Sequence, residues 1–191
     1  MKWTEEGGDE RPPTARERAP GILTGSGAVV CYVASIFLAN WLLATYGIIA
    51  VGFGLHAPAG VFAAGLAFVF RDEVQDRLGV RWVVVAIVIG ALASLLVAPT
   101  YAIASGVTFL VAEFADFAVY TPVRARSWIA AAVLSNTVGD LVDSALFLAL
   151  AFGSLANIVG LIVGKWYATL PVLAVFAYQR WRETRGPERA A

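Results

Sequence analysis

Six apolar segments, each long enough to be a membrane helix, take up most of this 191-residue chain. A bilayer core about 30 Å thick needs roughly 20 helical residues per crossing, so segments of this length predict transmembrane helices. Composition agrees, because 59% apolar residues, 15% charged residues and a mean hydropathy of +0.73 lie outside the usual range of soluble domains. We therefore expect an all-α polytopic membrane protein, a bundle of six transmembrane helices at about residues 27–46, 57–75, 82–98, 105–123, 128–152 and 156–178.

The positions of lysine and arginine predict how these helices cross the membrane. Basic residues collect on the cytoplasmic side of short loops. Of the 14 basic residues, all except Lys165 fall in the two ends of the chain, in the second-to-third junction, where we include Arg71, or in the fourth-to-fifth junction. The other three loops have none, so both termini are expected in the cytoplasm.

The two ends and the first loop differ in character from the helices. Residues 1–24 mix charges of both signs with proline and glycine and are expected to be a disordered cytoplasmic tail. They do not resemble a signal peptide, because hydrophobicity begins only near Gly25. Residues 25–180 would form one six-helix domain and residues 181–191 a second tail, while residues 47–59 are apolar enough for a re-entrant or interfacial loop.

Five charged residues lie well inside the last three apolar segments. Glu113 and Asp116 fall in the fourth segment, Asp140 and Asp143 in the fifth, and Lys165 in the sixth. A lysine or aspartate at the centre of a membrane helix costs about 2.5–3.5 kcal/mol, so Lys165 is expected to pair with one or more of these acids. Because residues i and i+3 share a helix face, each acidic pair should point one way.

Four carboxylates around one ammonium leave surplus negative charge. Uncharged polar residues in membrane helices often serve only as hydrogen-bond contacts between helices, but a surplus of acids must be hydrated, protonated or matched by a ligand that carries donors. Two parallel carboxylate acceptors suit the adjacent N–H donors of a guanine-like ring, and nearby aromatic side chains could stack on such a heterocycle. An organic cation or a proton would satisfy the same acids, so the sequence predicts a hydrated ligand or proton site.

Four stretches of the chain together resemble the queuosine precursor transporter family, also called the VUT family, of six-helix bacterial inner-membrane proteins. They are FRDEVQDRLG at residues 70–79, AEFADF at 112–117, NTVGDLVDSALFLALAF at 136–152 and GKWYATLP at 164–171. Family positions are matched at Asp72, Asp116, Asp143, Phe147 and Lys165. By contrast, Arg71, Glu113 and Asp140 replace residues that are uncharged in the family pattern, which changes the donors and acceptors of the site.

The resemblance implies import of a 7-deazaguanine queuosine precursor, 7-cyano-7-deazaguanine (preQ0) or its aminomethyl relative, across the cytoplasmic membrane. The aminomethyl cation would suit the extra acids. We expect substrate-binding residues on the fourth to sixth helices, and we assign a gating or ion-pair role to Asp72 and Asp76. The substrate-binding set is Glu113, Asp116, Tyr120, Asn136, Asp140, Asp143, Phe147 and Lys165.

Alternatives to transport are an intramembrane enzyme of the aspartyl type and a membrane scaffold. The sequence VGD at residues 138–140 is similar to a motif of intramembrane aspartyl proteases, but the accompanying Tyr-Asp motif is missing. No H-E-x-x-H, G-x-S-x-G or phosphate-loop motif occurs, so we expect no enzyme activity, no cofactor and no metal site. The expected partners are a purine-like substrate and the lipid bilayer, with no nucleic acid; a homodimer is left open, as is any dependence on a separate energising subunit.

Overall fold

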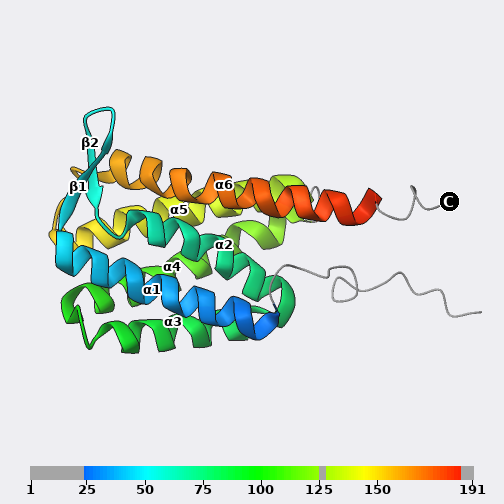
Figure 1. Ribbon diagram of the computed structural model, residues 1–191, viewed down its shortest axis with the longest axis horizontal. Coiled ribbons are helices and arrows are strands. Elements are labelled where there is room, and N and C mark those ends of the chain that lie inside the picture. Colours follow the sequence, from blue (N-terminus) through cyan, green and yellow to red (C-terminus); the bar gives the residue numbers. More distant parts are fainter. Residues whose placement is uncertain (1–23, 125–127, 186–191) are drawn as a thin grey trace, which may run out of the picture.

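The structure is a computed structural model that describes residues 24–124 and 128–185, and these fold into a bundle of helices (Figure 1). The prediction of an all-α bundle of six helices is confirmed. The start of α1 and the end of α6 lie at the same end of the bundle. The helices are α1 (Gly25–Tyr46), α2 (Val61–Leu78), α3 (Val80–Ser94), α4 (Pro99–Arg124), α5 (Trp128–Phe152) and α6 (Ile158–Arg185).

The two predicted tails are only partly open to comparison. Residues 1–23 and 186–191 lie outside the described part of the chain. Helix α6 continues as far as Arg185, so the first residues of the expected second tail at 181–191 are helical. Its charged last turns extend the helix beyond the apolar stretch from which the boundary was predicted.

A β-hairpin, which the sequence did not predict, connects α1 to α2. Strand β1 (Ile48–Gly52) pairs antiparallel with β2 (Leu55–Pro58). Gly52 and Gly54 have positive φ angles of 96° and 74°, which glycine adopts without a side-chain clash and which allow the tight turn. The expected re-entrant or interfacial loop is therefore a two-stranded ribbon, and it packs on α6 at one end of the bundle (Figure 1).

Three helices in the described part of the chain are long and apolar enough to cross a membrane, judged by length and composition. They span Gly25–Tyr46, Pro99–Val119 and Leu134–Phe152, and two shorter apolar helices span Val80–Ser94 and Ile158–Val172. Large apolar side chains also face outward, including Val30, Leu96, Phe114 and Leu170. An outer surface of this kind suits contact with lipid.

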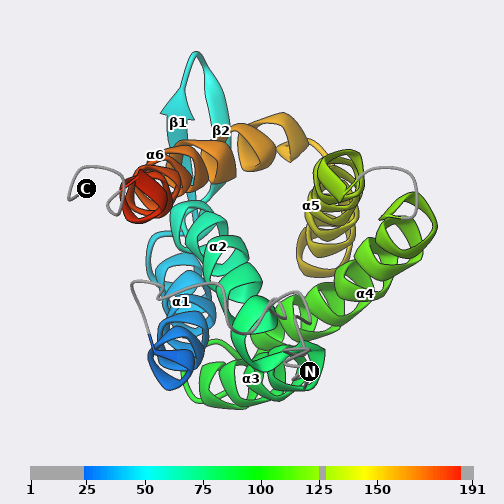
Figure 2. The same ribbon diagram turned by 90° about the vertical axis from the view of Figure 1, so that its right-hand side faces the viewer.

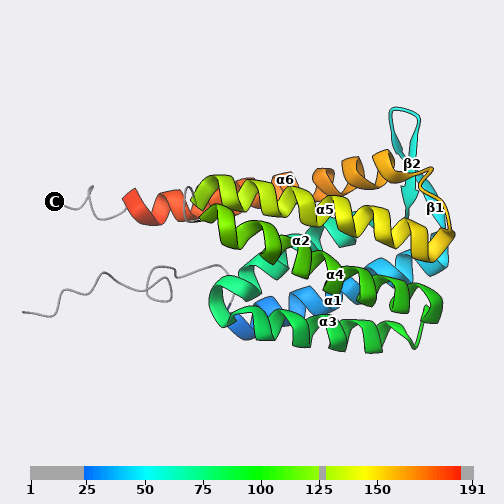
Figure 3. The same ribbon diagram turned by 180° about the vertical axis from the view of Figure 1, so that it is seen from behind.

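The helices form a ring when the bundle is seen from its end (Figure 2). Helix α4 packs mainly on α5, while α2 packs on α1 and α6, and α3 contacts both α1 and α4. From behind, α4 and α5 run side by side along the bundle (Figure 3). The molecule therefore has an α4–α5 pair on one side and α1, α2 and α6 on the other.

Close approach of α2 to α6 positions the residues of the site. Gly65 of α2 has no side chain, and a Cβ atom there would lie 2.5 Å from the backbone oxygen of Lys165 and 3.1 Å from Cβ of Ala168. Thr169 of α6 adds a hydrogen bond, because its Oγ1 donates to the Gly65 carbonyl oxygen at 3.0 Å. The backbone of α6 at Lys165 is thereby held directly on α2.

Candidate functional site

Lys165, on α6, is 2% exposed, and its ammonium contacts three side chains of α5. Its Nζ donates to Asp143 Oδ2 at 2.6 Å, to Asp140 Oδ1 at 2.8 Å and to Ser144 Oγ at 2.8 Å. An ammonium group has three N–H donors, so these contacts use all of them. Of the four acids that the sequence offers as partners, Lys165 binds the two on α5.

Arg71, on α2, is buried and is the centre of a second ion-pair cluster. Glu113 and Asp116 in this cluster are also buried, while Asp72 is partly exposed and Asn136 is exposed. Its Nη1 donates to Glu113 Oε2 at 3.0 Å, and its Nη2 donates to Asn136 Oδ1 at 2.8 Å and to Asp72 Oδ1 at 2.6 Å. Asp116 Oδ1 lies 3.9 Å from Nη2. We call Arg71, Asp72, Glu113, Asp116 and Asn136 the Arg71 cluster.

The position of Arg71 corrects two expectations from the sequence. Its assignment to a cytoplasmic junction is wrong, because α2 continues to Leu78 and Arg71 is 5% exposed inside the bundle. The acids also do not surround a single ammonium. They are divided between Lys165 and Arg71, so that the acids of α4 pair with α2 and those of α5 with α6.

Phe68, on α2, lies near both cations. Its ring centre is 5.0 Å from Lys165 Nζ and 5.7 Å from Arg71 Cζ, within the range of cation–π attraction. The ring of Phe109, from α4, packs edge-on against it with ring centres 6.4 Å apart. Phe68 is not among the residues predicted from the sequence, although its position three residues before Arg71 puts the two on one helix face.

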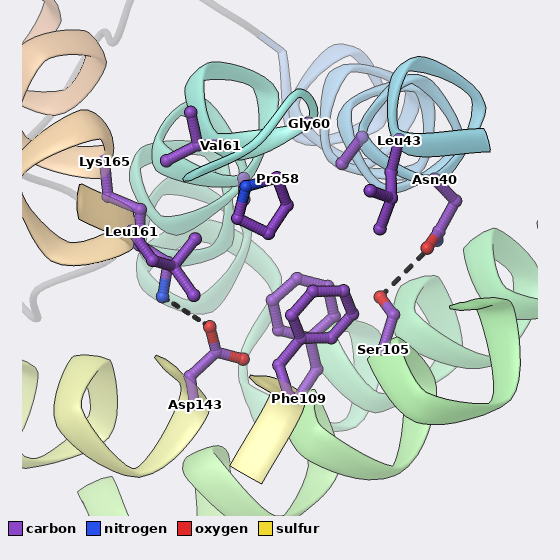
Figure 4. Close-up of a pocket in the computed structure, with 13 residues that line it drawn as sticks. Asn40, Leu43, Pro58, Gly60, Val61, Ser105, Phe109, Asp143, Leu161 and Lys165 are labelled. Atoms are coloured by element: carbon purple, nitrogen blue, oxygen red, sulfur yellow. Dashed lines mark hydrogen bonds and ion pairs between the residues drawn. The ribbon is translucent and has the colours of Figure 1, made fainter. Parts of the chain in front are cut away.

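A cavity lies beside Lys165, and its walls come from five helices and the end of the hairpin (Figure 4). Asp143 and Lys165 form part of one side, while Phe109 and Phe147 supply aromatic rings. The volume is about 30 Å³, which is room for water. Sites for small organic ligands are typically about 300–1,000 Å³, so a purine-sized guest would fit only if the walls of this cavity separated.

Asn40 and Ser105 line the opposite side of this cavity from Lys165 (Figure 4). The Asn40 side chain is 2% exposed, and its Nδ2 donates to the Ile36 carbonyl at 3.1 Å, to Ser94 Oγ at 3.2 Å and to Ser105 Oγ at 3.4 Å. These polar residues are absent from the predicted site. In the sequence, this part of the site is marked by one asparagine within the apolar run FLANWLL.

A second, smaller cavity of about 10 Å³ lies beside the Arg71 cluster. Phe109 lines both cavities. Two buried carboxylate oxygens near this place, Glu113 Oε1 and Asp116 Oδ1, have no hydrogen-bond partner. Buried polar atoms nearly always have one, so these oxygens are unmet acceptors. The residues that line the second cavity are Tyr32, Ala67, Phe68, Arg71, Phe109, Ala112 and Glu113.

The remaining predicted residues are dispersed. Phe147 lines the first cavity and packs edge-on against Phe152, with ring centres 6.2 Å apart. Asp72 belongs to the Arg71 cluster, whereas Asp76 is exposed near the end of α2 and lines neither cavity. Tyr120 is in α4, but its side chain lies outside the described part of the structure.

The bundle has an apolar outer surface and helices long enough to cross a bilayer, which together define a membrane protein. Its charged side chains gather around internal cavities, and buried ionisable groups in membrane bundles mark paths for polar solutes. A family profile described as "putative vitamin uptake transporter" matches residues 94–178, from the end of α3 into α6. Over this part of the chain, the match agrees with the resemblance drawn from the sequence motifs. It favours transport over catalysis. No curated protein and no solved structure matches the chain.

Proposed function

We propose that this protein imports a 7-deazaguanine queuosine precursor, 7-cyano-7-deazaguanine or its aminomethyl relative, across the bacterial cytoplasmic membrane. The observation that carries the proposal is the ion pair of Asp143 with Lys165 on the wall of an internal cavity that also contains two phenylalanine rings. The family match supports uptake of a vitamin-like solute. The side chains of the cavity support a flat heterocycle with several N–H donors.

The chemistry of the cavity wall suits such a substrate. Asp143 gives one oxygen to Lys165, and its other oxygen points away from the ammonium toward the middle of the lining residues (Figure 4). A carboxylate oxygen in this place accepts from the N–H edge of a guanine-like ring. Phe109 and Phe147 would stack on the ring, and the side-chain carbonyl of Asn40, whose amide N–H groups are used within the protein, would accept from the far edge of the ring.

Substrate entry requires the closed cavity to open. The ion pairs of Lys165 with Asp143 and of Arg71 with Glu113 join α6 and α2 to the α4–α5 pair. Because α4 and α5 pack mainly on each other, they can move as a unit against the other helices. In this proposal, movement of the α4–α5 pair gives alternating access to the cavity from the two sides of the membrane, and the ion pairs break and form at each end of the transport cycle.

Complementation tests the proposed function and the site together. A bacterium unable to make the precursor, supplied with external 7-cyano-7-deazaguanine, should gain the modified nucleoside in its tRNA when the protein is expressed. Asp143→Asn removes one of the two carboxylate charges that Lys165 binds, the one on the cavity wall, and should lower nucleoside formation at least about tenfold, the loss that corresponds to about 1.4 kcal/mol of binding. Nucleoside content is measured by mass spectrometry, with protein abundance in the membrane measured in parallel.

Glu73→Gln is the matched control. Glu73 is also a buried acid of the bundle, but it pairs with Arg77 one turn along α2 and lines neither cavity. This variant should keep wild-type nucleoside formation. If the wild-type protein gives no modified nucleoside, the substrate is wrong; if Asp143→Asn is as active as wild type at equal abundance, the site is wrong.

A further inference from the structure

The Arg71 cluster contains more negative than positive charge, and more acceptors than donors. Three carboxylates, from Asp72, Glu113 and Asp116, surround its one guanidinium. Glu113 and Asp116 are 3% and 4% exposed, and each has an oxygen without a hydrogen-bond partner. Burying an ionised carboxylate without a hydrogen-bond donor is costly, so two such oxygens on neighbouring side chains indicate that a further donor or cation binds at this cluster.

A proton fits this place better than a metal ion. Glu113 and Asp116 are three residues apart on α4, so their side chains are neighbours on one helix face. One shared proton would turn one carboxyl into an O–H donor and leave the other as its acceptor, which would supply the hydrogen bond that both oxygens lack and cancel one negative charge.

Space and charge oppose a larger cation. The adjoining cavity of about 10 Å³ has room for about one water molecule. The Arg71 guanidinium, 3.0 Å from Glu113, would repel a metal cation. Within the described residues, no group of three or more His, Cys, Asp or Glu side chains is placed to hold a metal ion.

The titratable and charged groups around Glu113 come from every element that meets at the cluster. Tyr32 of α1 and Arg71 of α2 line the same cavity as Glu113. Phe68 lies near both Arg71 and Lys165, and Lys165 pairs with the acids of α5. Among the described side chains, this set comprises Tyr32 on α1, Arg71 and Asp72 on α2, Asp116 on α4, Asp140 and Asp143 on α5, and Lys165 on α6.

We propose that Glu113 and Asp116 form a proton-binding site that couples import of the substrate to entry of a proton. This proposal rests on the transport function proposed above. A proton on Glu113 removes its negative charge and so weakens its ion pair with Arg71, which ties α4 to α2. The proton is taken from outside, changes how readily the α4–α5 pair moves, and leaves to the cytoplasm, which returns both carboxyls to their starting state.

Purified full-length protein in lipid vesicles allows a direct test with labelled 7-cyano-7-deazaguanine. Uptake is measured in two modes, as exchange without any gradient and as accumulation driven by an inward proton gradient. A sodium gradient alone serves as a separate arm. Wild type should accumulate the base with the proton gradient and not with sodium.

Glu113→Gln should lower the ratio of gradient-driven uptake to exchange by at least about tenfold, within the range usual for coupling between two sites. Glu73→Gln, the same substitution at an acid already paired with Arg77, should keep the wild-type ratio. An unchanged ratio in Glu113→Gln, or accumulation by wild type with sodium alone, would overturn the proton site.

Infrared difference spectra separate failure of the proton site from failure of the proposed substrate. If wild type shows no exchange, 7-cyano-7-deazaguanine is the wrong substrate, and spectra of the reconstituted chain across a range of pH decide the proton site. A protonated-carboxyl C=O stretch that Glu113→Gln or Asp116→Asn removes, and that Glu73→Gln keeps, supports the site. Absence of this band, or its persistence in Glu113→Gln and Asp116→Asn alike, overturns it.

Discussion

Lys165 gives all three of its N–H donors to side chains of α5, so charge as well as packing joins α6 to α5. A buried ion pair adds little net stability compared with apolar residues of the same size. Removing one partner is different, because the other charge then stays buried without a counterion. Lys165 therefore matters chiefly as the counterion of Asp140 and Asp143 inside the bundle, and less for the net stability that the ion pairs add.

Lys165→Met should lower the free energy of unfolding by about 3–5 kcal/mol, because Asp143 and Asp140 lose their cation. Adding Asp143→Leu should recover part of this loss, since it removes one of the uncompensated carboxylates. Unfolding of the purified protein in detergent micelles measures both effects. Equal losses in the single and the double variant would show that the unpaired charge is not the cause.

At the scale of the helices, small residues decide how closely the polar side chains meet. Gly65 allows α2 to touch the backbone of α6 at Lys165, and Gly160 lies directly against the backbone of His56, where the hairpin packs on α6. Glycine in a membrane helix permits this approach because nothing projects between the two backbones. The geometry of the Lys165 contacts thus depends on residues that carry no polar group.

Gly65→Ala should destabilise the protein by about 1–3 kcal/mol and reduce uptake, because the new Cβ would lie 2.5 Å from the Lys165 carbonyl oxygen and would push α6 from α2. Gly139→Ala is the matched control on α5, where the nearest atom would be 3.7 Å away, an ordinary contact. Thermal unfolding and labelled-base uptake are measured for both. Similar losses in the two variants would argue that helix separation is not responsible.

At the scale of the whole molecule, the even number of helices brings the start of α1 and the end of α6 to one end, and the hairpin lies at the other (Figure 1). Arg77 and Arg81 flank the junction of α2 and α3. Moving Arg71 from that junction into the bundle leaves these two arginines as the basic residues there. The prediction that both termini face the cytoplasm therefore does not depend on Arg71.

A fluorescent protein fused after residue 191 should be folded and bright in the cytoplasm. A single cysteine placed at Phe53 in the hairpin turn, in a Cys31→Ser background, should react with a membrane-impermeant maleimide added to intact cells, because Phe53 is 91% exposed. Labelling of this cysteine only after the cells are opened would reverse the predicted orientation.

The sequence alone predicts the helices, but it does not predict which side chains meet between them. The cost of charge in lipid identifies Glu113, Asp116, Asp143 and Lys165 as inward-facing groups, and all four are buried. The same reasoning misplaces Arg71, because a charged turn at the end of an apolar helix has the pattern of a cytoplasmic junction. Asn40 and Phe68 carry no signal stronger than one polar or aromatic residue in an apolar run.

The sequence by itself determined that this chain is a bundle of six helices with acids and a lysine inside it, because bilayer thickness sets the length of each apolar run and charge is excluded from lipid. Only the tertiary structure decided which acid meets which cation, that the polar groups fall into two clusters beside Phe68, and that the cavity is closed to about 30 Å³. The reason is physical. Periodicity reports which face of a helix turns inward, whereas pairing depends on how far apart and at what height two helices cross, and small residues such as Gly65 set that distance.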